Sequence, residues 1–200
     1  MSTLVRSICF AFTLATGMVC PAQERPLEGV RFPIMWYGSN EAPVKILAFM
    51  SASCVDCIRA FRYGIENLKR DYIDSGNVQL TILPFAFSDK DLNFLILLAC
   101  SRQGFSRTFE WHMKNGYPND SNWTLRNANN AGLNIPMKLA DCPQEKILRI
   151  TLTQIRESAE RKWRISEVPY FIIGGVGFGP DWRRIQARVD QELSAIGAKK

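Results

Sequence analysis

Two cysteines, Cys54 and Cys57, stand close together in the stretch FMSASCVDCIRAF, with only Val55 and Asp56 between them. Thiols at this spacing can close a small disulfide ring, share a metal ion or exchange bonds reversibly with another disulfide. Reversible exchange needs one thiol that attacks as a thiolate and a second thiol that resolves the mixed disulfide. The segments on either side of the pair decide which of these chemistries is favoured.

The flanking segments favour reversible exchange. The run VKILAFM (44–50) is apolar and of strand length, and from Val55 to about Tyr72 apolar residues recur every three or four positions, as in an amphipathic helix. Cys54 then lies at the first turn of this helix, where unpaired N–H groups and the helix dipole favour a thiolate. Cys57 lies one turn deeper. We therefore predict Cys54 as the nucleophile and Cys57 as the resolving thiol.

Val55 and Asp56 are the residues expected to tune the pair. A carboxylate beside the sulfurs repels a thiolate, so Asp56 should raise the pKa of Cys54, against the helix dipole, and favour the disulfide form. The predicted direction is a weaker oxidant than a site with a cation or a histidine in this place. The alternative is that Asp56 points into water, where solvent screens its charge.

The first residues, MSTLVRSICFAFTLATGMVCPAQE, are typical of a secretory signal. Arg6 precedes an apolar core at about residues 8–19, which is shorter than a membrane span, and small residues lead to a cleavage site after Ala22. An uncleaved anchor is the alternative. Cleavage removes two of the six cysteines, and the even number that remains favours disulfides in an oxidising compartment.

The charge of the chain argues against a nucleic-acid partner. Cleavage removes one basic residue and no acid, so the formal net charge falls from +6 to about +5. The basic residues are scattered, and no nucleic-acid motif accompanies them. A solvated basic surface is therefore the preferred interpretation.

The other potential thiol and imidazole ligands are Cys100, Cys142 and the lone His112. A tetrahedral zinc site would need two of them beside the pair, and this is the least favoured interpretation. An inert disulfide across the pair is also less favoured, because structural bridges usually close longer loops. For Cys100 and Cys142 a structural disulfide, one of three pairings of four cysteines, is favoured over two free thiols. His112 is interpreted as a partly buried helix residue rather than a ligand or base.

The remaining pattern is that of an α/β domain with an insertion. VQLTILPFAF (78–87) follows the first helix as a strand, so a parallel strand pair with a helical crossover is expected. From about residue 90 to 164 the pattern is helical. VPYFIIGG (168–175) is then a strand, VGFG (176–179) its candidate hairpin partner, and residues 181–196 a closing helix with Asp181 as its cap.

A second functional element is EVPYF (167–171), in which a proline opens a strand. If the bond between Val168 and Pro169 is cis, this loop can lie against Cys54 and shape a substrate groove. An ordinary trans proline that opens an edge strand is the alternative, because only a few per cent of X–Pro bonds are cis.

These motifs, in this order, resemble the DsbA-like branch of the thioredoxin superfamily. GSNEAPVKILAFMSASCVDC (38–57) is similar to that family's turn, central strand and active-site CxxC, and LACSRQGFSRTFEWHMK (98–114) to the start of its helical insertion. AGLNIPMKLADC (131–142) resembles the segment that carries a partner cysteine in some members, and ISEVPYFIIGG (165–175) the cis-proline strand. The resemblance covers about residues 27–196.

The resemblance implies a thioredoxin fold with an inserted helical subdomain. A signal peptide (1–22) would precede a thioredoxin-like domain formed by two segments, 27–90 and 165–198, and interrupted by a helical insertion, 91–164. Val168–Pro169 would be cis. Three features depart from the usual pattern of the family: Val–Asp replaces the common Pro–His between the cysteines, Ala48 stands where members often carry an acid, and Val168, a residue that some members share, replaces the usual small or hydroxyl residue before the proline.

The function that the resemblance implies is a periplasmic thiol–disulfide oxidoreductase. Its substrates would be cysteine-containing polypeptides held beside Val168 and Pro169, a membrane redox partner would restore it, and it would need no cofactor. A monomer is expected. A reductase is a variant within the same class of enzyme. The alternative is a thioredoxin-fold binding module dedicated to one envelope partner, in which the redox chemistry is incidental.

Overall fold

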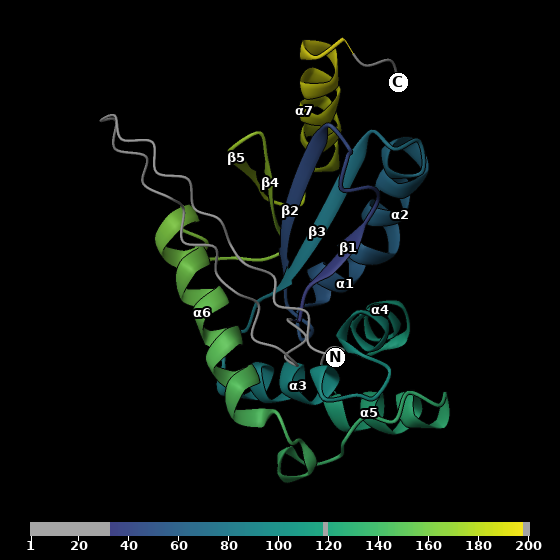
Figure 1. Cartoon of the computed structure of the whole chain (residues 1–200), viewed down its shortest axis with the longest axis vertical. Coiled ribbons are helices and arrows are strands. Elements are labelled where there is room, and N and C mark those ends of the chain that lie inside the picture. The colour runs from purple at the N-terminus through teal and green to yellow at the C-terminus, as the bar shows by residue number, and fades with distance from the viewer. Residues whose placement is uncertain (1–32, 118–119, 198–200) are drawn as a thin grey trace, which may run out of the picture. The chain divides into compact units, whose positions relative to one another are not determined.

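The computed structural model of the chain describes residues 33–117 and 120–197 (Figure 1). The predicted signal peptide lies outside the described residues, and all that follows concerns the compact unit to which the described residues belong. No helix in the described ranges has both the length and the apolar character needed to cross a bilayer.

Five strands form one mixed sheet in the order β1-β3-β2-β4-β5. Strands β2 and β3 run parallel, and the other three neighbouring pairs are antiparallel. The expected parallel pair with a helical crossover is therefore confirmed, as is the hairpin that closes the sheet. The bounds of the strands are β1 Met35–Tyr37, β2 Val44–Met50, β3 Val78–Pro84, β4 Tyr170–Ile173 and β5 Val176–Phe178.

The crossover between β2 and β3 is one continuous helical segment that begins directly after Cys54. It alternates between α-helix and the wider π-helix, which accommodates an extra residue per turn. We call this segment the CxxC helix. Its parts are α1 Val55–Arg59, η1 Ala60–Ile65, α2 Glu66–Leu68 and η2 Lys69–Ile73, of which η1 and η2 are π-helical.

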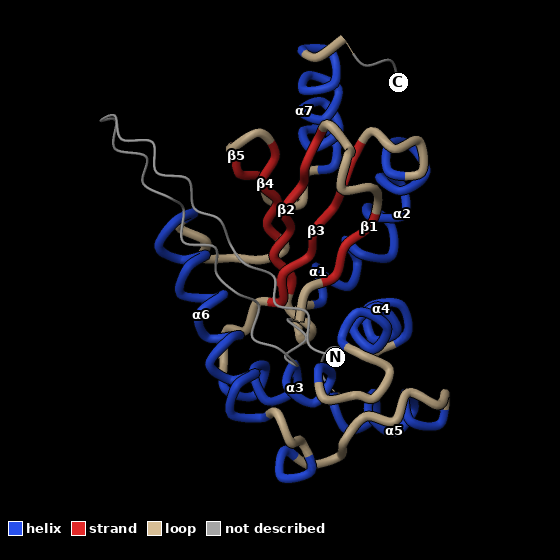
Figure 2. Tube along the Cα trace, viewed as in Figure 1, coloured by secondary structure: helices blue, strands red, loops and turns tan. Residues whose placement is uncertain are grey.

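Helices α3 to α6 lie between β3 and β4 in the chain, where the helical pattern was predicted. Figure 2 shows α3, α4 and α5 gathered beyond one end of the sheet. Thr108 and His112 are fully buried polar residues of α4. The bounds of the helices are α3 Asp89–Ala99, α4 Phe105–Asn115, α5 Ser121–Asn130, a short 3-10 turn η3 Leu139–Asp141, α6 Glu145–Trp163 and the final helix α7 Trp182–Ala195.

Each face of the sheet packs against different helices because side chains alternate along β2. Ile46 and Ala48 belong to the main core, which they share with the CxxC helix and α7. Phe49 points to the opposite face and belongs to a smaller cluster with Ala159 of α6. The CxxC helix thus packs on the face of the sheet that carries Ile46 and Ala48.

Close packing against α7 fixes the CxxC helix further along. A Cβ atom added at Gly64 would lie 1.7 Å from the ring of Trp182, so only glycine allows this approach. Trp182 is the first residue of α7, and Asp181 caps that helix by accepting the N–H groups of Arg183 and Arg184. The predicted cap is therefore confirmed.

Candidate active site

Cys54 is the N-cap residue of α1, with an extended backbone (φ −92°, ψ 119°). Its sulfur accepts a hydrogen bond from the backbone N–H of Cys57 at 3.1 Å. This is the position in which a side chain satisfies one of the unpaired N–H groups at a helix start. The Cys54 side chain is half-buried, and Val55 beside it is exposed. The sulfur is therefore both accessible and stabilised as an anion.

Cys57 lies one turn further along, completely buried. The backbone N–H of Ser51 points to its sulfur at 3.4 Å. Burial, followed by the hydrogen bond to Cys54, raises the pKa of the Cys57 thiol far above its ordinary value. Cys57 is therefore protonated at neutral pH and inaccessible to any large reactant. Both cysteines carry free thiols in this structure.

The pKa of the Cys54 thiol is lowered from 9.0 to about 7. The hydrogen bond from the Cys57 thiol is the largest cause, burial acts against it, and the backbone N–H groups of Cys57 and Asp56 lower the pKa further. The charge of Asp56 raises the pKa, which is the direction expected from the sequence, but it is the weakest of these influences. Asp56 is mostly exposed and pairs with Arg59 at 3.0 Å. The pKa of Cys54 is thus lowered overall, whereas the charge of Asp56 alone would raise it.

The loop before β4 lies against the nucleophile although it is distant in sequence. The peptide bond between Val168 and Pro169 is cis. The Cys54 thiol donates to the carbonyl oxygen of Val168 at 3.4 Å. Pro169 is buried and Val168 is half-buried. The structure thus brings together the two motifs that the sequence singled out, CVDC and EVPYF.

The strand beneath the pair has an apolar residue at the position where an acid is frequent in the DsbA-like branch. Ala48 is fully buried in β2 and pairs with Phe171 of β4. No proton acceptor is present at this position of the strand. Ala48 can therefore take no part in proton transfer to or from Cys57.

The other two cysteines of the described region are joined. Cys100, at the end of α3, and Cys142, after η3, form a disulfide with their Cα atoms 5.6 Å apart. They lie among the inserted helices. No group of three or more His, Cys, Asp or Glu side chains suited to a metal ion occurs within residues 33–117 and 120–197.

His112 lies nearer to the pair than the sequence indicated. His112 of α4 is completely buried, not partly buried as expected, and its Nε2 lies 2.6 Å from the carbonyl oxygen of Ala52. Ala52 precedes the CxxC by two residues. The one available signal was the place of His112 on the apolar face of α4, seven residues after Phe105 and three after Phe109.

Comparison with known proteins identifies the family. A family model described as thioredoxin matches residues 33–191, which is most of the chain. The chain belongs to the thioredoxin family. A search of curated protein sequences finds no significant match. The prediction of a thioredoxin fold with inserted helices is confirmed by this match and by the solved structures that resemble the chain.

Those thioredoxin-fold structures include DsbA proteins of several bacteria. Wolbachia pipientis alpha-DsbA1 has a TM-score of 0.68 at 17% identity, over 85% of this chain and 94% of that one. Chlamydia trachomatis DsbA has a TM-score of 0.61 at 17% identity, over 94% of this chain and 100% of that one. A protein-disulfide isomerase from Novosphingobium aromaticivorans has a TM-score of 0.64 at 15% identity, over 80% of this chain and 100% of that one. At these identities the likeness establishes the fold, and the DsbA-like arrangement of the chain is thereby confirmed.

Proposed function

We propose that the chain is an exported thiol–disulfide oxidoreductase that exchanges disulfides with cysteine-containing polypeptides through Cys54 and Cys57. The observation that carries this proposal is the half-buried Cys54 sulfur, which lies at a helix N-terminus, 3.1 Å from the Cys57 N–H and 3.4 Å from the Val168 carbonyl. The DsbA and disulfide isomerase names of the structural relatives support the same class of reaction. The periplasm is the proposed compartment.

In the reducing direction, the Cys54 thiolate attacks one sulfur of a substrate disulfide. A bond forms between Cys54 and that sulfur, and the other substrate sulfur leaves as a thiolate. Cys57 then gives its proton to the departing thiolate and attacks the Cys54 sulfur, which breaks the mixed disulfide and releases the second substrate sulfur as a thiolate. The products are the Cys54–Cys57 disulfide and a reduced substrate, whose second sulfur takes a proton from water. The buried position of Cys57 confines it to this second, intramolecular step.

In the oxidising direction the same steps run backwards. A substrate thiolate attacks Cys54 of the Cys54–Cys57 disulfide, and Cys57 leaves and takes up a proton. A second substrate thiolate then attacks the substrate sulfur of the mixed disulfide, and Cys54 leaves as a thiolate. The N–H groups at the start of α1 stabilise this leaving group, because a thiol of lower pKa leaves faster. A membrane redox partner would reset the pair after each turnover.

Val168 and Pro169 are the proposed substrate-binding residues. The backbone of the half-buried Val168 lies beside Cys54, with its carbonyl oxygen 3.4 Å from the sulfur, and an extended substrate segment can pair with the backbone of this loop, as in other cases of strand addition. The proposed contact involves the main chain, so it selects for extended cysteine-containing segments more than for particular side chains. A monomer suffices for this reaction.

The pKa of Cys54 bears on the direction of electron flow. CxxC nucleophiles range from about 3.5 in DsbA to about 7 in thioredoxin, and a lower value marks a more stable reduced form and a stronger oxidant. Cys54, at about 7, belongs at the thioredoxin end. We therefore propose a weak oxidant or a reductase within this class. The disulfide of Cys100 and Cys142 is proposed to be structural.

Trapping of mixed disulfides tests the function. Cys57→Ser cannot resolve the intermediate, so substrates should remain attached to Cys54 and be released by dithiothreitol. The matched control is Cys54→Ser, in which the remaining thiol is buried and should trap nothing. Many trapped partners support a general oxidoreductase, whereas one dominant partner supports the dedicated binding module. Absence of any adduct with Cys57→Ser contradicts the proposal.

A further inference from the structure

The backbone segment that precedes the CxxC is held by a side chain of the inserted helices. His112 comes from α4, and its Nε2 lies 2.6 Å from the carbonyl oxygen of Ala52, 60 residues earlier in the chain. A carbonyl oxygen can only accept a hydrogen bond, so Nε2 carries the hydrogen and Nδ1 of the neutral ring carries a lone pair. Both the His112 ring and Ala52 are buried from solvent.

The peptide group between Ala52 and Ser53 is fixed at both of its polar ends. Its carbonyl oxygen accepts from His112, and its N–H, which belongs to Ser53, donates to Oγ of Ser51 at 3.1 Å. The next residue is Cys54, whose own N–H donates to the carbonyl oxygen of Ser51. The same Ser51 directs its N–H at the Cys57 sulfur. The orientation of this one peptide group therefore bears on the positions of both sulfurs.

The surroundings of His112 keep its ring in one place. The ring of Phe94 meets it edge to face at 5.0 Å between centroids. A Cβ atom added at Gly116 would lie 2.1 Å from Nδ1, so the ring fits only against a glycine. Nδ1 has no hydrogen-bond partner among the described residues, and burial, with a smaller effect of the Arg62 charge, lowers the pKa of His112 to about 4. The ring is thus neutral and immobile at physiological pH.

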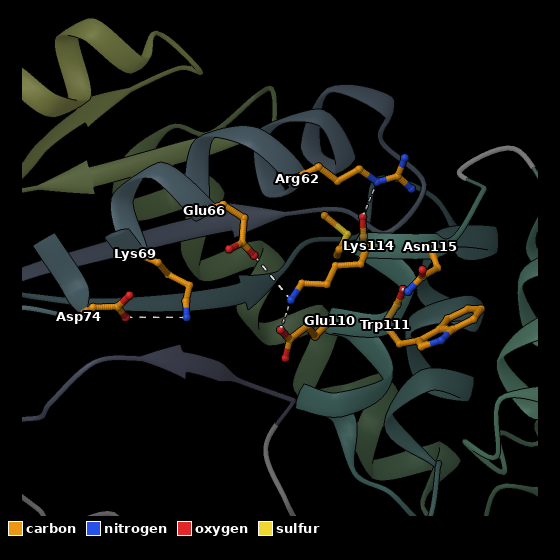
Figure 3. A network of polar contacts seen from close by, with 9 residues as sticks. Arg62, Glu66, Lys69, Asp74, Glu110, Trp111, Lys114 and Asn115 are labelled. Carbon is orange, nitrogen blue, oxygen red and sulfur yellow. Dashed lines mark hydrogen bonds and ion pairs between the residues drawn. The ribbon is translucent and has the colours of Figure 1, made fainter. Parts of the chain in front are cut away.

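A second set of contacts holds α4 against the CxxC helix itself. Arg62 donates from Nε to the carbonyl oxygen of Met113 at 3.0 Å and from Nη2 to that of Gly116 at 3.1 Å. Figure 3 shows Arg62 reaching the end of α4. It also shows Lys114 of α4 between Glu110 of the same helix and Glu66 of the CxxC helix. The helix that supplies His112 is therefore fastened to the helix that carries the cysteines.

We propose that His112 is a positioning residue of the redox pair, which sets the properties of Cys54 by holding the Ala52 carbonyl through Nε2–H. The proposal rests on the proposed function. Without this bond the turn from Ser51 to Cys54 loosens, and the Cys54 thiolate is held less well over the start of α1. The pKa of Cys54 then rises, and the disulfide form becomes more stable relative to the dithiol.

Substitution of His112 by leucine tests the role, with glutamine as the conservative variant, because the glutamine amide nitrogen can take the place of Nε2. For His112→Leu we expect the equilibrium with glutathione to shift about three- to tenfold toward the disulfide, the size of effect that one buried hydrogen bond gives. The pKa of Cys54 should rise with it. His112→Gln should restore both quantities to within about twofold of wild type.

A matched control separates this role from plain stability. Thr108 is also fully buried on α4, and its Oγ1 donates to the carbonyl oxygen of Leu98 at 2.8 Å rather than to the turn that precedes the CxxC. Thr108→Val should lower the melting temperature as His112→Leu does, with no change in the glutathione equilibrium. If His112→Leu lowers the melting temperature and leaves both the equilibrium and the pKa of Cys54 unchanged, the proposal is overturned.

Two further measurements apply where His112→Leu does not fold. Gly116→Ala keeps the imidazole but crowds Nδ1, and it should shift the equilibrium and the Cys54 pKa in the same direction. His112 is the one histidine of the chain, so labelling the wild-type protein with ¹⁵N-histidine gives the signals of this ring alone. We expect the Nε2–H tautomer, with resonances that differ between the dithiol and disulfide forms. The Nδ1–H tautomer, or identical signals in both forms, would overturn the proposal.

These outcomes are distinct from failure of the proposed function. A wild-type protein that exchanges no disulfide with glutathione contradicts the function. In that event the pKa of Cys54, read by alkylation in wild type, His112→Leu and His112→Gln, still decides whether His112 positions the thiol.

Discussion

Removing the Cys57 thiol should expose how Cys54 is activated. The hydrogen bond from that thiol is the largest cause of the low Cys54 pKa, and burial of Cys54 opposes it. In Cys57→Ala the bond is lost while the backbone N–H remains, so the pKa should return at least half of the way from about 7 to 9.0. Cys57→Ser keeps a hydroxyl donor and should return less far.

The expected change in rate follows from the ionised fraction. At pH 7 a thiol of pKa 7 is about half ionised, and one of pKa 9 about 1% ionised. The loss of thiolate is therefore about five- to fiftyfold for the range predicted. A more basic thiolate is also a better nucleophile, with a Brønsted coefficient of about 0.4–0.5, which recovers part of the rate. Alkylation of Cys54 by iodoacetamide at pH 7 should thus slow by about two- to eightfold in Cys57→Ala.

The assay is alkylation by iodoacetamide between pH 5 and 10, followed by mass spectrometry of the peptide that contains Cys54. The rate should rise with pH through a midpoint near 7 in wild type, because the thiolate is the reacting form. A wild-type midpoint near 9, or the same midpoint in Cys57→Ala as in wild type, would refute the reasoning. Equal midpoints in the alanine and serine variants would show that the hydrogen of the Cys57 side chain is not the cause.

Three other perturbations have defined outcomes. Asp56→Asn should lower the pKa of Cys54 by no more than about 0.7 unit, since exposed charges interact by about 0.2–1 kcal/mol; alkylation profiles measure this, and a fall well above one unit would show that Asp56 dominates. Gly64→Ala forces a methyl group into Trp182 and should cost about 1–3 kcal/mol in urea unfolding, despite alanine's better helix propensity; an unchanged midpoint would contradict the packing. Cys142→Ser opens a bridge that spans 42 residues and should lower stability by up to about 4 kcal/mol, with glutathione exchange at the active site changed less than twofold.

Much of the central architecture could be predicted because it depends on local patterns. The apolar strand, the CxxC and the amphipathic helix follow one another within thirty residues or so, and the structure places the helix from Val55 to Ile73 where the spacing indicated. The alternation of α- and π-helix within it could not be predicted, since tight packing such as that of Gly64 on Trp182 acts between distant segments. The strand at 78–87 ends earlier than expected, at Pro84, because β2 ends at Met50, its partner residue.

The site was predicted less completely than the fold. The sequence identified Cys54 and Cys57 and their order of burial, because a helix start and a helical turn are local features. It overestimated Asp56, whose charge is offset by Arg59 one turn away and by solvent. It did not indicate that His112 reaches Ala52, since 60 residues of chain separate them and only the packing of α4 brings them together.

The most direct test of the account is the equilibrium of wild-type protein with reduced and oxidised glutathione, followed by mass mapping of the disulfides. We expect one reversible disulfide, between Cys54 and Cys57, with a potential nearer the thioredoxin value of about −270 mV than the DsbA value of about −120 mV. A potential near the DsbA value would contradict the proposed weak oxidant. A pair that remains reduced, or remains oxidised, across the whole range of glutathione buffers would contradict the proposal that these two thiols exchange disulfides.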